Sequence, residues 1–290
     1  VNEPYAPVIA AHPALTGIIP FARRRFGRWH SPSAMRALAG FLWDLRRRRY
    51  DLVLDLQGLI RTGIFTWMTR APYRLGFAQA GELAWLGYTR TEDQPLQRHA
   101  VGRLLALVAA VGITPVPDAR LYLAPADDAW ARAYCAQQRL VPGQYPLLAP
   151  TAQWRCKCWP VEHYAALAQQ LLAAGCWGAR VVVLAAPHEA QALEPLLQTL
   201  GAQALRPTTQ VGQMMALIAH AGLVVANDSA ALHIATGFDR PLVGIFGPTD
   251  PARFGPFQRP EAVVQPDPPV DYTRLNYRDF PHDQTLIRRV

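Results

Sequence analysis

Short, largely apolar runs alternate with helical segments through the second half of this chain, and this alternation constrains the fold more than any other feature. The predicted strands are Pro146–Pro150, Arg180–Ala186, Leu223–Asn227 and Pro241–Phe246. The predicted helices run from Trp159-Pro160 to Gly175, over His188–Thr199, over Val211–His220 and over Asp228–Gly237. Strands that are apolar on both faces are typical of parallel sheets covered by helices on both sides. From about residue 141 the sequence therefore predicts one doubly wound α/β lobe.

The first part of the chain follows the same rhythm less regularly. Tyr50–Leu56 is a predicted strand, closed by Gln57-Gly58 and followed by a helical pattern from Leu59 to about Arg70. The arginine run 46–49 ends an amphipathic stretch, a position where cations are favoured because of the helix dipole. Residues 266–290 are rich in proline, and we expect them to form a tail that packs on the lobes. We predict two domains, residues 1–140 and residues 141–290, the second including this tail.

Composition and spacing exclude several classes of protein. No apolar run reaches the roughly 18 to 20 residues that a membrane-spanning helix needs. The four cysteines, Cys135, Cys156, Cys158 and Cys176, lack the spacing of a zinc site or of a C-x-x-C redox pair. The patterns H-x-x-x-H and D-x-D do not occur either, so we expect no metal site. A soluble protein with free thiols in the reducing cytoplasm is the simplest interpretation.

The positive charge lies in the first part of the chain. The net charge is +8; residues 1–120 hold 16 arginines and 8 acidic residues, whereas residues 121–290 hold 13 basic and 13 acidic residues. Such a bias predicts an anionic partner: a phosphorylated or carboxylated sugar, an acidic lipid surface or a nucleic acid. No nucleic-acid-binding motif accompanies the charge, so we expect no nucleic acid partner.

The junction between the strand Leu223–Asn227 and the following helix carries side chains suited to phosphate. In an open parallel sheet, ligands bind beyond the carboxyl ends of the strands, where helix N-termini present unpaired N–H groups. The small residues Ser229 and Ala230 would let a phosphate approach those amides, and Ser229 adds a hydroxyl donor. His233 follows four residues later and is expected on the same helix face. The alternative is that Asp228 or Ser229 only caps the helix, with His233 an ordinary surface histidine.

A second junction runs from Thr151 to Pro160. It holds Lys157, the only lysine in the chain, whose compact ammonium suits a point contact with phosphate. A solvated loop lysine is the alternative. Glu189 follows the next predicted strand, where a carboxylate can accept hydrogen bonds from the two hydroxyls of a ribose. A glutamate that only stabilises the first turn of a helix explains Glu189 equally well.

Taken in order, these residues resemble the lipopolysaccharide heptosyltransferases of glycosyltransferase family 9, and the resemblance covers nearly the whole chain. In the C-terminal half the family motifs K-x-W-P-x-E, H-E, D-[ST]-G-x-x-H and G-P-T-D-P resemble Lys157–Glu162, His188-Glu189, Asp228–His233 and Gly247–Pro251. In the N-terminal half Y-D-x-V-I-D-x-Q-G-L resembles Tyr50–Leu59, and H-A-V-E-R resembles His99–Arg103. These N-terminal pieces are most similar to the heptosyltransferase I branch of the family.

The resemblance implies a GT-B fold, an α/β architecture of two Rossmann-like lobes with parallel sheets. Residues 1–140 would bind the acceptor and residues 141–290 the nucleotide sugar. The implied reaction is an inverting, metal-independent transfer of L-glycero-D-manno-heptose from ADP-heptose to the Kdo sugar of lipid A or to an inner-core heptose, without a cofactor.

The resemblance also assigns residues to the two substrates. The donor site would comprise Thr151, Lys157, Glu189, Asp228, Ser229, Ala230 and His233. The anionic acceptor would meet Arg23, Arg24, Arg25 and Arg61. The expected location is the cytoplasmic face of the inner membrane, in peripheral contact with its surface.

The sequence departs from the family pattern in several places. Residues 1–8 resemble a part of the family that follows its opening strand and its loop with a catalytic aspartate. We therefore expect a truncated N-terminal lobe and assign no catalytic residue. Ala230 and Thr151 stand where the family often has glycine. The alternatives are a nucleotide-sugar-binding protein without turnover, or another GT-B enzyme that acts on sugar nucleotides.

Overall fold

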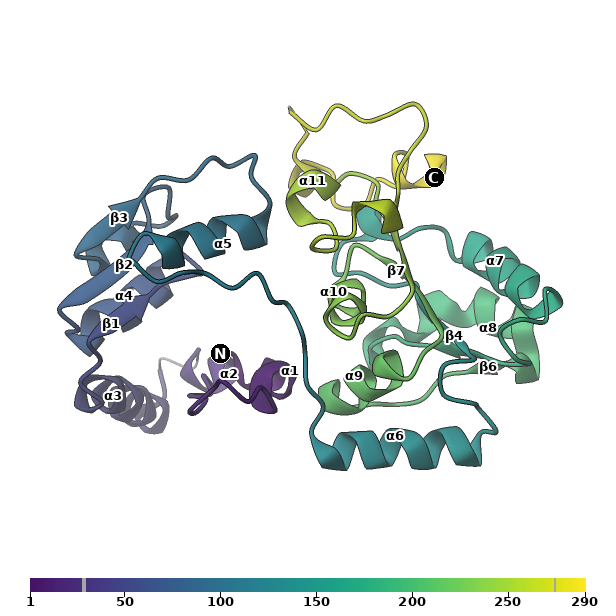
Figure 1. Ribbon diagram of the computed structural model, residues 1–290, viewed down its shortest axis with the longest axis horizontal. Helices are drawn as coiled ribbons and strands as arrows, with labels where there is room; N and C mark the ends of the chain where they lie inside the picture. Colours follow the sequence, from purple (N-terminus) through teal and green to yellow (C-terminus); the bar gives the residue numbers. More distant parts are fainter. Residues whose placement is uncertain (28–29, 274) are drawn as a thin grey trace. The chain divides into compact units, whose positions relative to one another are not determined.

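The chain forms two compact units. The computed structural model describes residues 1–27, 30–273 and 275–290, and Figure 1 shows their helices and strands. Unit 1 comprises Val1–Glu3 and Pro20–Asp118, and unit 2 comprises Pro4–Ile19 and Ala119–Val290. The boundary at residue 118 lies earlier than the predicted one at residue 140. The reason is the helix α6 (Pro125–Gln137), whose buried Ala131 and Cys135 belong to the core of unit 2.

Unit 2 is built on a six-stranded parallel sheet with the strand order β6-β5-β4-β7-β8-β9. The strands are β4 (Pro146–Ala149), β5 (Val181–Val183), β6 (Ala204–Leu205), β7 (Leu223–Asn227), β8 (Leu242–Ile245) and β9 (Val263–Val264). The chain enters the sheet at its centre with β4, proceeds outward to β6, and then returns to the other side of β4 with β7. This order, 3-2-1-4-5-6 when the strands of the unit are counted along the chain, is that of a doubly wound dinucleotide-binding fold.

Helices cover both faces of this sheet because its strands are apolar on both faces. Successive side chains of a strand point to opposite sides. Leu147 packs in a core with α9 (Val211–Ala219) and α10 (Ala230–Gly237), and Leu148 packs in a second core with α7 (Val161–Ala173) and α8 (Glu194–Leu200). The two helix pairs lie on opposite sides of the strands in Figure 1. Besides α6 to α10, the unit contains the short helices η1 (Glu3–Tyr5, which begins in unit 1), α1 (Pro7–Ala10), η3 (Arg155–Lys157), η4 (Pro187–Leu193), η5 (Gly201–Gln203), α11 (Pro251–Phe254) and η6 (Pro260–Ala262). The predicted α/β class with parallel sheets is confirmed.

Two of the predicted helices differ in their limits. The segment predicted as one helix over His188–Thr199 is a 3-10 helix, η4, followed by α8, with Pro195 in the first turn of α8. The break arises because a proline cannot donate the backbone hydrogen bond that a helix interior requires. The helix predicted from Asp228 begins at Ala230 instead, since Ser229 is extended (φ −149°, ψ 172°).

Unit 1 contains a three-stranded parallel sheet with the order β1-β2-β3. Its strands are β1 (Leu52–Leu54), β2 (Tyr73–Phe77) and β3 (Arg90–Glu92), and its helices are α2 (Arg23–Phe26), α3 (Pro32–Arg47), α4 (Ile60–Thr69), η2 (Ala84–Gly87) and α5 (Ala100–Ala109). Sequence analysis anticipated β1, α4 and the end of α3 but not β2 or β3, because arginine and glutamate interrupt their apolar pattern. Within the described residues no helix is long and apolar enough to cross a membrane.

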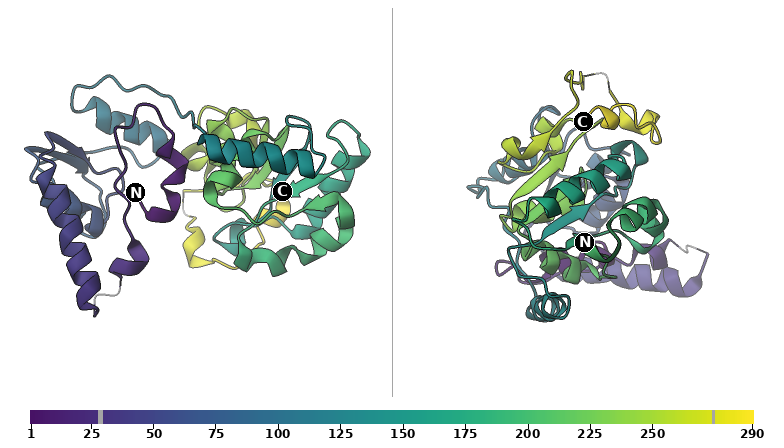
Figure 2. Two further views of the ribbon diagram at one scale, coloured as in Figure 1. Left: turned by 90° about the horizontal axis from the view of Figure 1, so that it is seen from below. Right: turned by 90° about the vertical axis from the view of Figure 1, so that its right-hand side faces the viewer.

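The C-terminal tail packs on unit 2. It includes η7 (Tyr277–Asp279) and η8 (Ile287–Arg289), drawn in yellow beside the other elements of the unit in Figure 2. Ile287 has no exposed surface and lies in the core with α7 and α8. A methyl group on Gly247 would come within 2.8 Å of the Ile287 side chain. Apolar burial of Ile287 therefore contributes to holding the tail against the loop that follows β8.

We expect Ile287→Ala to lower the free energy of unfolding by about 2 to 5 kcal/mol, the range measured when a large buried aliphatic side chain is truncated. Urea unfolding followed by circular dichroism measures this change. Val141→Ala, at a position where the side chain is mostly exposed, serves as the control and should change the value by less than about 0.5 kcal/mol. Equal stability of the Ile287→Ala variant and the wild type would contradict the packing of the tail.

Candidate functional site

The centre of the sheet in unit 2 is a topological switch point, and a buried asparagine organises it. In the parallel pairing of β4 with β7, Ala149 lies opposite Ala226, so the residues that follow them lie side by side. The buried Asn227 amide donates to the Pro150 carbonyl (2.7 Å), and its oxygen accepts from the Trp159 backbone N–H (3.1 Å) and the Tyr164 hydroxyl (3.0 Å). Asn227 thereby fixes both ends of the loop that carries Lys157.

Lys157 and Asp228 form a largely buried ion pair at this switch point. The Lys157 Nζ–Asp228 Oδ2 distance is 2.7 Å, and the two side chains are 12% and 10% exposed. The Lys157 ammonium also lies 4.2 Å from the ring centroid of Tyr277, which belongs to the C-terminal tail. A cation against an aromatic face is attracted by the ring quadrupole. Lys157 is thus held in place, so its interpretation as a solvated loop lysine does not fit.

The start of α10 presents Ser229 to the same region. Ser229 occupies the N-cap position, but its side chain makes no capping hydrogen bond. Within the described residues its buried hydroxyl oxygen has no hydrogen-bond partner. The alternative that Ser229 serves only as a helix cap is therefore not supported. Ala230 follows in the first helical turn and is not among the described residues with positive φ, so its backbone conformation does not require glycine.

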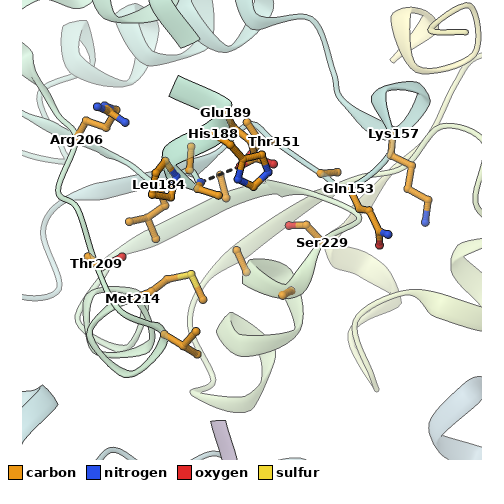
Figure 3. Close-up of a pocket in the computed structure, with 18 of the residues that line it drawn as sticks. Thr151, Gln153, Lys157, Leu184, His188, Glu189, Arg206, Thr209, Met214 and Ser229 are labelled. Atoms are coloured by element: carbon orange, nitrogen blue, oxygen red, sulfur yellow. Dashed lines mark hydrogen bonds between the residues drawn. The ribbon is translucent and has the colours of Figure 1, made fainter. Parts of the chain in front are cut away.

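A cavity of about 760 Å³ extends from this switch point along the carboxyl edge of the sheet, and Figure 3 shows many of its lining residues. Thr151 follows β4, Glu189 follows β5, Arg206 follows β6 and Asp228 follows β7. Neighbouring strands lie about 4.8 Å apart, so four strands span about 14 Å. The cavity therefore suits an extended ligand lying across the four strand ends.

The two ends of the cavity differ in chemistry. Gln153, Lys157 and Ser229 gather at one end in Figure 3, whereas Leu184, Arg206, Thr209 and Met214 lie toward the other.

Sequence analysis did not assign Gln153, Leu184, Arg206 or Met214 to a site. Their positions just after strands or in the first turn of a helix were the available signal. Tyr277 was also missed, because the tail shows no periodic pattern from which its location could be inferred.

Two residues assigned to the donor site, Glu189 and His233, and the G-P-T-D-P motif make contacts or take positions that the family resemblance did not predict. Glu189 lines the cavity, but its Oε2 also accepts a hydrogen bond from the Ala186 N–H (2.8 Å) at the start of η4. This contact supports the helix-stabilising interpretation without excluding a second contact through Oε1. His233 is exposed on α10 and, in the described part of the chain, lies outside the set of cavity-lining residues. The loop Gly247–Pro251 also lies outside that set; Asp250 caps α11, with its Oδ1 accepting from the Ala252 N–H (2.9 Å).

The four arginines predicted to meet the acceptor gather around one aromatic cluster in unit 1. Phe21, Phe26, Phe41 and Phe65 form five ring pairs with centroids 5.0 to 5.7 Å apart. This cluster attaches the short helix α2, which carries the exposed Arg23, Arg24 and Arg25, to α3 and α4. The Arg61 guanidinium lies 5.4 Å from the Phe21 ring centroid. Arg61 and the helix that carries Arg23–Arg25 thus contact the same aromatic cluster, although nearly 40 positions separate them in the sequence.

Asp55 shapes the loop after β1 in the same unit. Its buried carboxylate accepts from the backbone N–H groups of Gln57 (3.0 Å) and Gly58 (3.1 Å) and from the Tyr88 hydroxyl (2.7 Å). Burial and the neighbouring carboxylate raise the pKa of Tyr88, which stays a neutral donor. Gly58 has a positive φ of 67°, a conformation that glycine adopts without strain. The D-x-Q-G motif therefore encodes a fixed turn.

No group of three or more histidine, cysteine, aspartate or glutamate side chains that could hold a metal ion occurs within residues 1–27, 30–273 and 275–290. That transfer proceeds without a metal stays a prediction.

The fold and site together are those of an α/β protein with a cavity at the switch point of a doubly wound parallel sheet. The family model of glycosyltransferase family 9 (heptosyltransferase) matches residues 40–269, most of the chain. This protein belongs to that family and is a glycosyltransferase.

Similar proteins agree with this assignment. Lipopolysaccharide heptosyltransferase 1 of Escherichia coli K12 is 27% identical over 276 residues, covering 91% of this chain and 82% of the relative. The heptosyltransferase 1 of Pseudomonas aeruginosa is 29% identical over 288 residues, covering 93% and 75%. The solved structure of the E. coli heptosyltransferase WaaC with ADP matches with a TM-score of 0.73 and 26% identity, covering 91% of this chain and 81% of that one. The predicted GT-B fold is thereby confirmed.

The contact between Lys157 and Tyr277 can be tested by NMR with a single label. Because Lys157 is the only lysine, lysine labelled at Cε gives one resonance from the whole chain. In the wild type the ring current of Tyr277 should shift the Lys157 ε-protons upfield. We expect Tyr277→Leu to move them downfield and Tyr277→Phe to leave them nearly unchanged. Tyr272→Leu, which alters another tail tyrosine, is the control; an unchanged resonance in Tyr277→Leu would contradict the contact.

Proposed function

We propose that this glycosyltransferase transfers L-glycero-D-manno-heptose from ADP-heptose to the Kdo-bearing lipid A acceptor of lipopolysaccharide core assembly, with inversion and without a metal or other cofactor. The observation that carries the donor assignment is the Lys157–Asp228 pair beside the unpaired Ser229 hydroxyl, at one end of an elongated cavity. That the related WaaC has been solved with ADP supports the choice of nucleotide.

The proposed nucleoside position is the part of the cavity along β5 and β6. Leu184 and Met214 line it with apolar surface that can contact a base, and Thr209 adds a polar group. Glu189 lies between this region and the switch point. A carboxylate has two oxygens, so one can retain the Ala186 N–H while the other accepts from a ribose hydroxyl.

The proposed diphosphate position is the switch point. Charge builds up on the diphosphate as the bond between the sugar and the donor breaks, and fixed positive groups there stabilise the transition state. Lys157, the Ser229 hydroxyl and the N-terminal amides of α10 supply such groups. Asp228 holds the ammonium at the sheet edge, so little reorganisation is needed when the ligand binds. We assign no residue of this chain to the removal of the acceptor proton.

The proposed acceptor surface is formed by Arg23, Arg24, Arg25 and Arg61. The exposure of Arg23, Arg24 and Arg25 on α2, the half-buried Arg61 on α4 and the excess of arginine in residues 1–120 support binding of an anionic lipid-linked sugar. Because such an acceptor is part of a membrane, the proposal includes peripheral contact with the cytoplasmic face of the inner membrane.

We expect ADP to bind the wild-type protein and Lys157→Ala to weaken binding by about 10- to 100-fold. The reason is that a hydrogen bond to a charged group contributes about 1.5 to 3 kcal/mol. Isothermal titration calorimetry measures both affinities. Arg155→Ala is the matched control, because Arg155 is a basic residue of the same loop that is exposed and lies outside the described lining of the cavity.

A double variant separates two causes of the loss. Lys157→Ala leaves the Asp228 carboxylate without its cation, and that charge alone could repel ADP. If Lys157 contacts the diphosphate, Lys157→Ala/Asp228→Asn still binds weakly; recovery of wild-type affinity would show that only repulsion was at work. Absence of ADP binding to the folded wild type would overturn the site. ADP binding without turnover of ADP-heptose would favour a binding protein over an enzyme.

We expect acceptor affinity to fall as salt rises, because exposed charges are screened beyond about 10 Å at 0.1 M ionic strength. Replacing Arg23, Arg24 and Arg25 together by glutamine should weaken binding at low salt and remove most of the salt dependence. Binding of detergent-solubilised acceptor, measured across a salt series, checks this expectation. Replacing Arg47, Arg48 and Arg49 by glutamine removes the same charge from the end of α3 and should have the smaller effect. Equal effects of the two sets would argue against a specific acceptor surface.

A further inference from the structure

Unit 1 carries an exposed apolar surface that the proposed reaction does not use. It consists of Ile60, Ile64 and Trp67 of α4 with Leu83 and Leu86 at η2, and we refer to it as the α4–η2 patch. These five side chains are 46% to 62% exposed and surround a hollow of about 300 Å³. Soluble proteins expose single apolar residues routinely, but a contiguous set marks an interaction surface.

The sequence makes α4 apolar on two sides. Phe65 joins the aromatic cluster that packs on α3, which accounts for one side. Ile60, Ile64 and Trp67 follow the i, i+4, i+7 spacing of a second stripe, which in a soluble helix normally faces a core.

Close backbone packing explains why this second stripe remains exposed. A methyl group on Gly63 would lie 2.6 Å from the Ala84 carbonyl oxygen, and one on Gly87 would collide with the backbone of Gly63. The two glycines bring α4 and η2 together with no room for side chains between them. The apolar side chains of both elements therefore border the contact and face solvent.

The unit that carries the patch is positively charged. Its two ranges, Val1–Glu3 and Pro20–Asp118, hold 15 arginines and 8 acidic residues. Arg61 and Arg70 stand at the start and just after the end of α4. Glu82 accepts a hydrogen bond from the Ile60 N–H (3.3 Å), and Arg90 pairs with Glu92 (2.6 Å). An apolar surface within a basic region is complementary to a bilayer that carries anionic headgroups.

We propose that the α4–η2 patch inserts shallowly into the surface of an anionic phospholipid bilayer. Its aliphatic side chains enter the boundary between headgroups and acyl chains, while Arg70 contacts lipid phosphates. Trp67 and the exposed Trp85 of η2 are of the residue type that is enriched at membrane–water interfaces. The inference names the surface that would bring the proposed reaction to its membrane, but it depends on neither the donor nor the acceptor assignment.

The test uses the full chain and vesicles that contain no acceptor. Sedimentation with vesicles of phosphatidylcholine alone, and of phosphatidylcholine mixed with phosphatidylglycerol, measures binding. We expect the wild type to bind the mixed vesicles and Ile64→Ser/Leu86→Ser to bind them about 100-fold more weakly, because burial of each aliphatic side chain contributes about a tenfold factor. Val116→Ser/Val141→Ser, which changes two exposed valines elsewhere, should bind like the wild type. Arg70→Glu should weaken binding to the mixed vesicles.

Fluorescence places the patch itself in the bilayer. The chain has eight tryptophans, so the contribution of Trp67 is the difference between the wild type and Trp67→Phe. Brominated lipids should quench the wild type more than this variant.

Three results would overturn the proposal. They are no binding to mixed vesicles, equal binding of the patch variant and the wild type, or self-association of the wild type without lipid that the patch variant abolishes. The last result would assign the surface to a second copy of the chain. ADP affinity, measured in parallel, should be unchanged in the patch variant, so this test and that of the donor site fail independently.

Discussion

The buried amide of Asn227 is the contact on which the site in unit 2 depends. Asn227 is the last residue of β7. Its side chain forms hydrogen bonds with the Pro150 carbonyl after β4, with the Trp159 backbone N–H and with the Tyr164 hydroxyl of α7. A buried amide left without partners costs about 1 to 3 kcal/mol, so these bonds are made together or the loop between Thr151 and Pro160 moves. The position of Lys157 against Asp228 follows from them.

The C-terminal tail is the second support of this site. Ile287 anchors it in the core, and Tyr277 then lies against the Lys157 ammonium. The backbone N–H of Cys156 donates to the Pro281 carbonyl (3.0 Å), and the Gln284 amide donates to the Cys158 carbonyl (2.8 Å). The loop that carries the only lysine is thus held from two directions, by the sheet edge and by the tail. Such rigidity suits the diphosphate contact proposed for Lys157, because fixed groups need no reorganisation when a ligand binds.

Unit 1 uses a different construction. Aromatic packing, rather than a sheet edge, gathers its basic side chains, since Phe21, Phe26, Phe41 and Phe65 attach α2 to α3 and α4. Glycine contacts between α4 and η2 leave a further apolar surface in solvent. Basic residues and apolar side chains are therefore both available on one unit, a combination suited to an anionic lipid-linked substrate and to the bilayer that carries it.

The sequence by itself determined the α/β class, the strands β4 and β7 of the switch point, and the residues Lys157, Glu189, Asp228 and Ser229 as candidates. Apolar runs and small residues at strand ends are patterns of neighbouring residues, so they can be recognised in the sequence alone. Only the tertiary structure decided that Lys157 pairs with Asp228 across 71 positions, that Tyr277 lies against Lys157 and that His233 is on the exposed side of α10. It also decided that Arg61 contacts the aromatic cluster that anchors α2. These relations arise from sheet register, aromatic packing and burial of a patternless tail, all of which depend on residues that are distant in the chain.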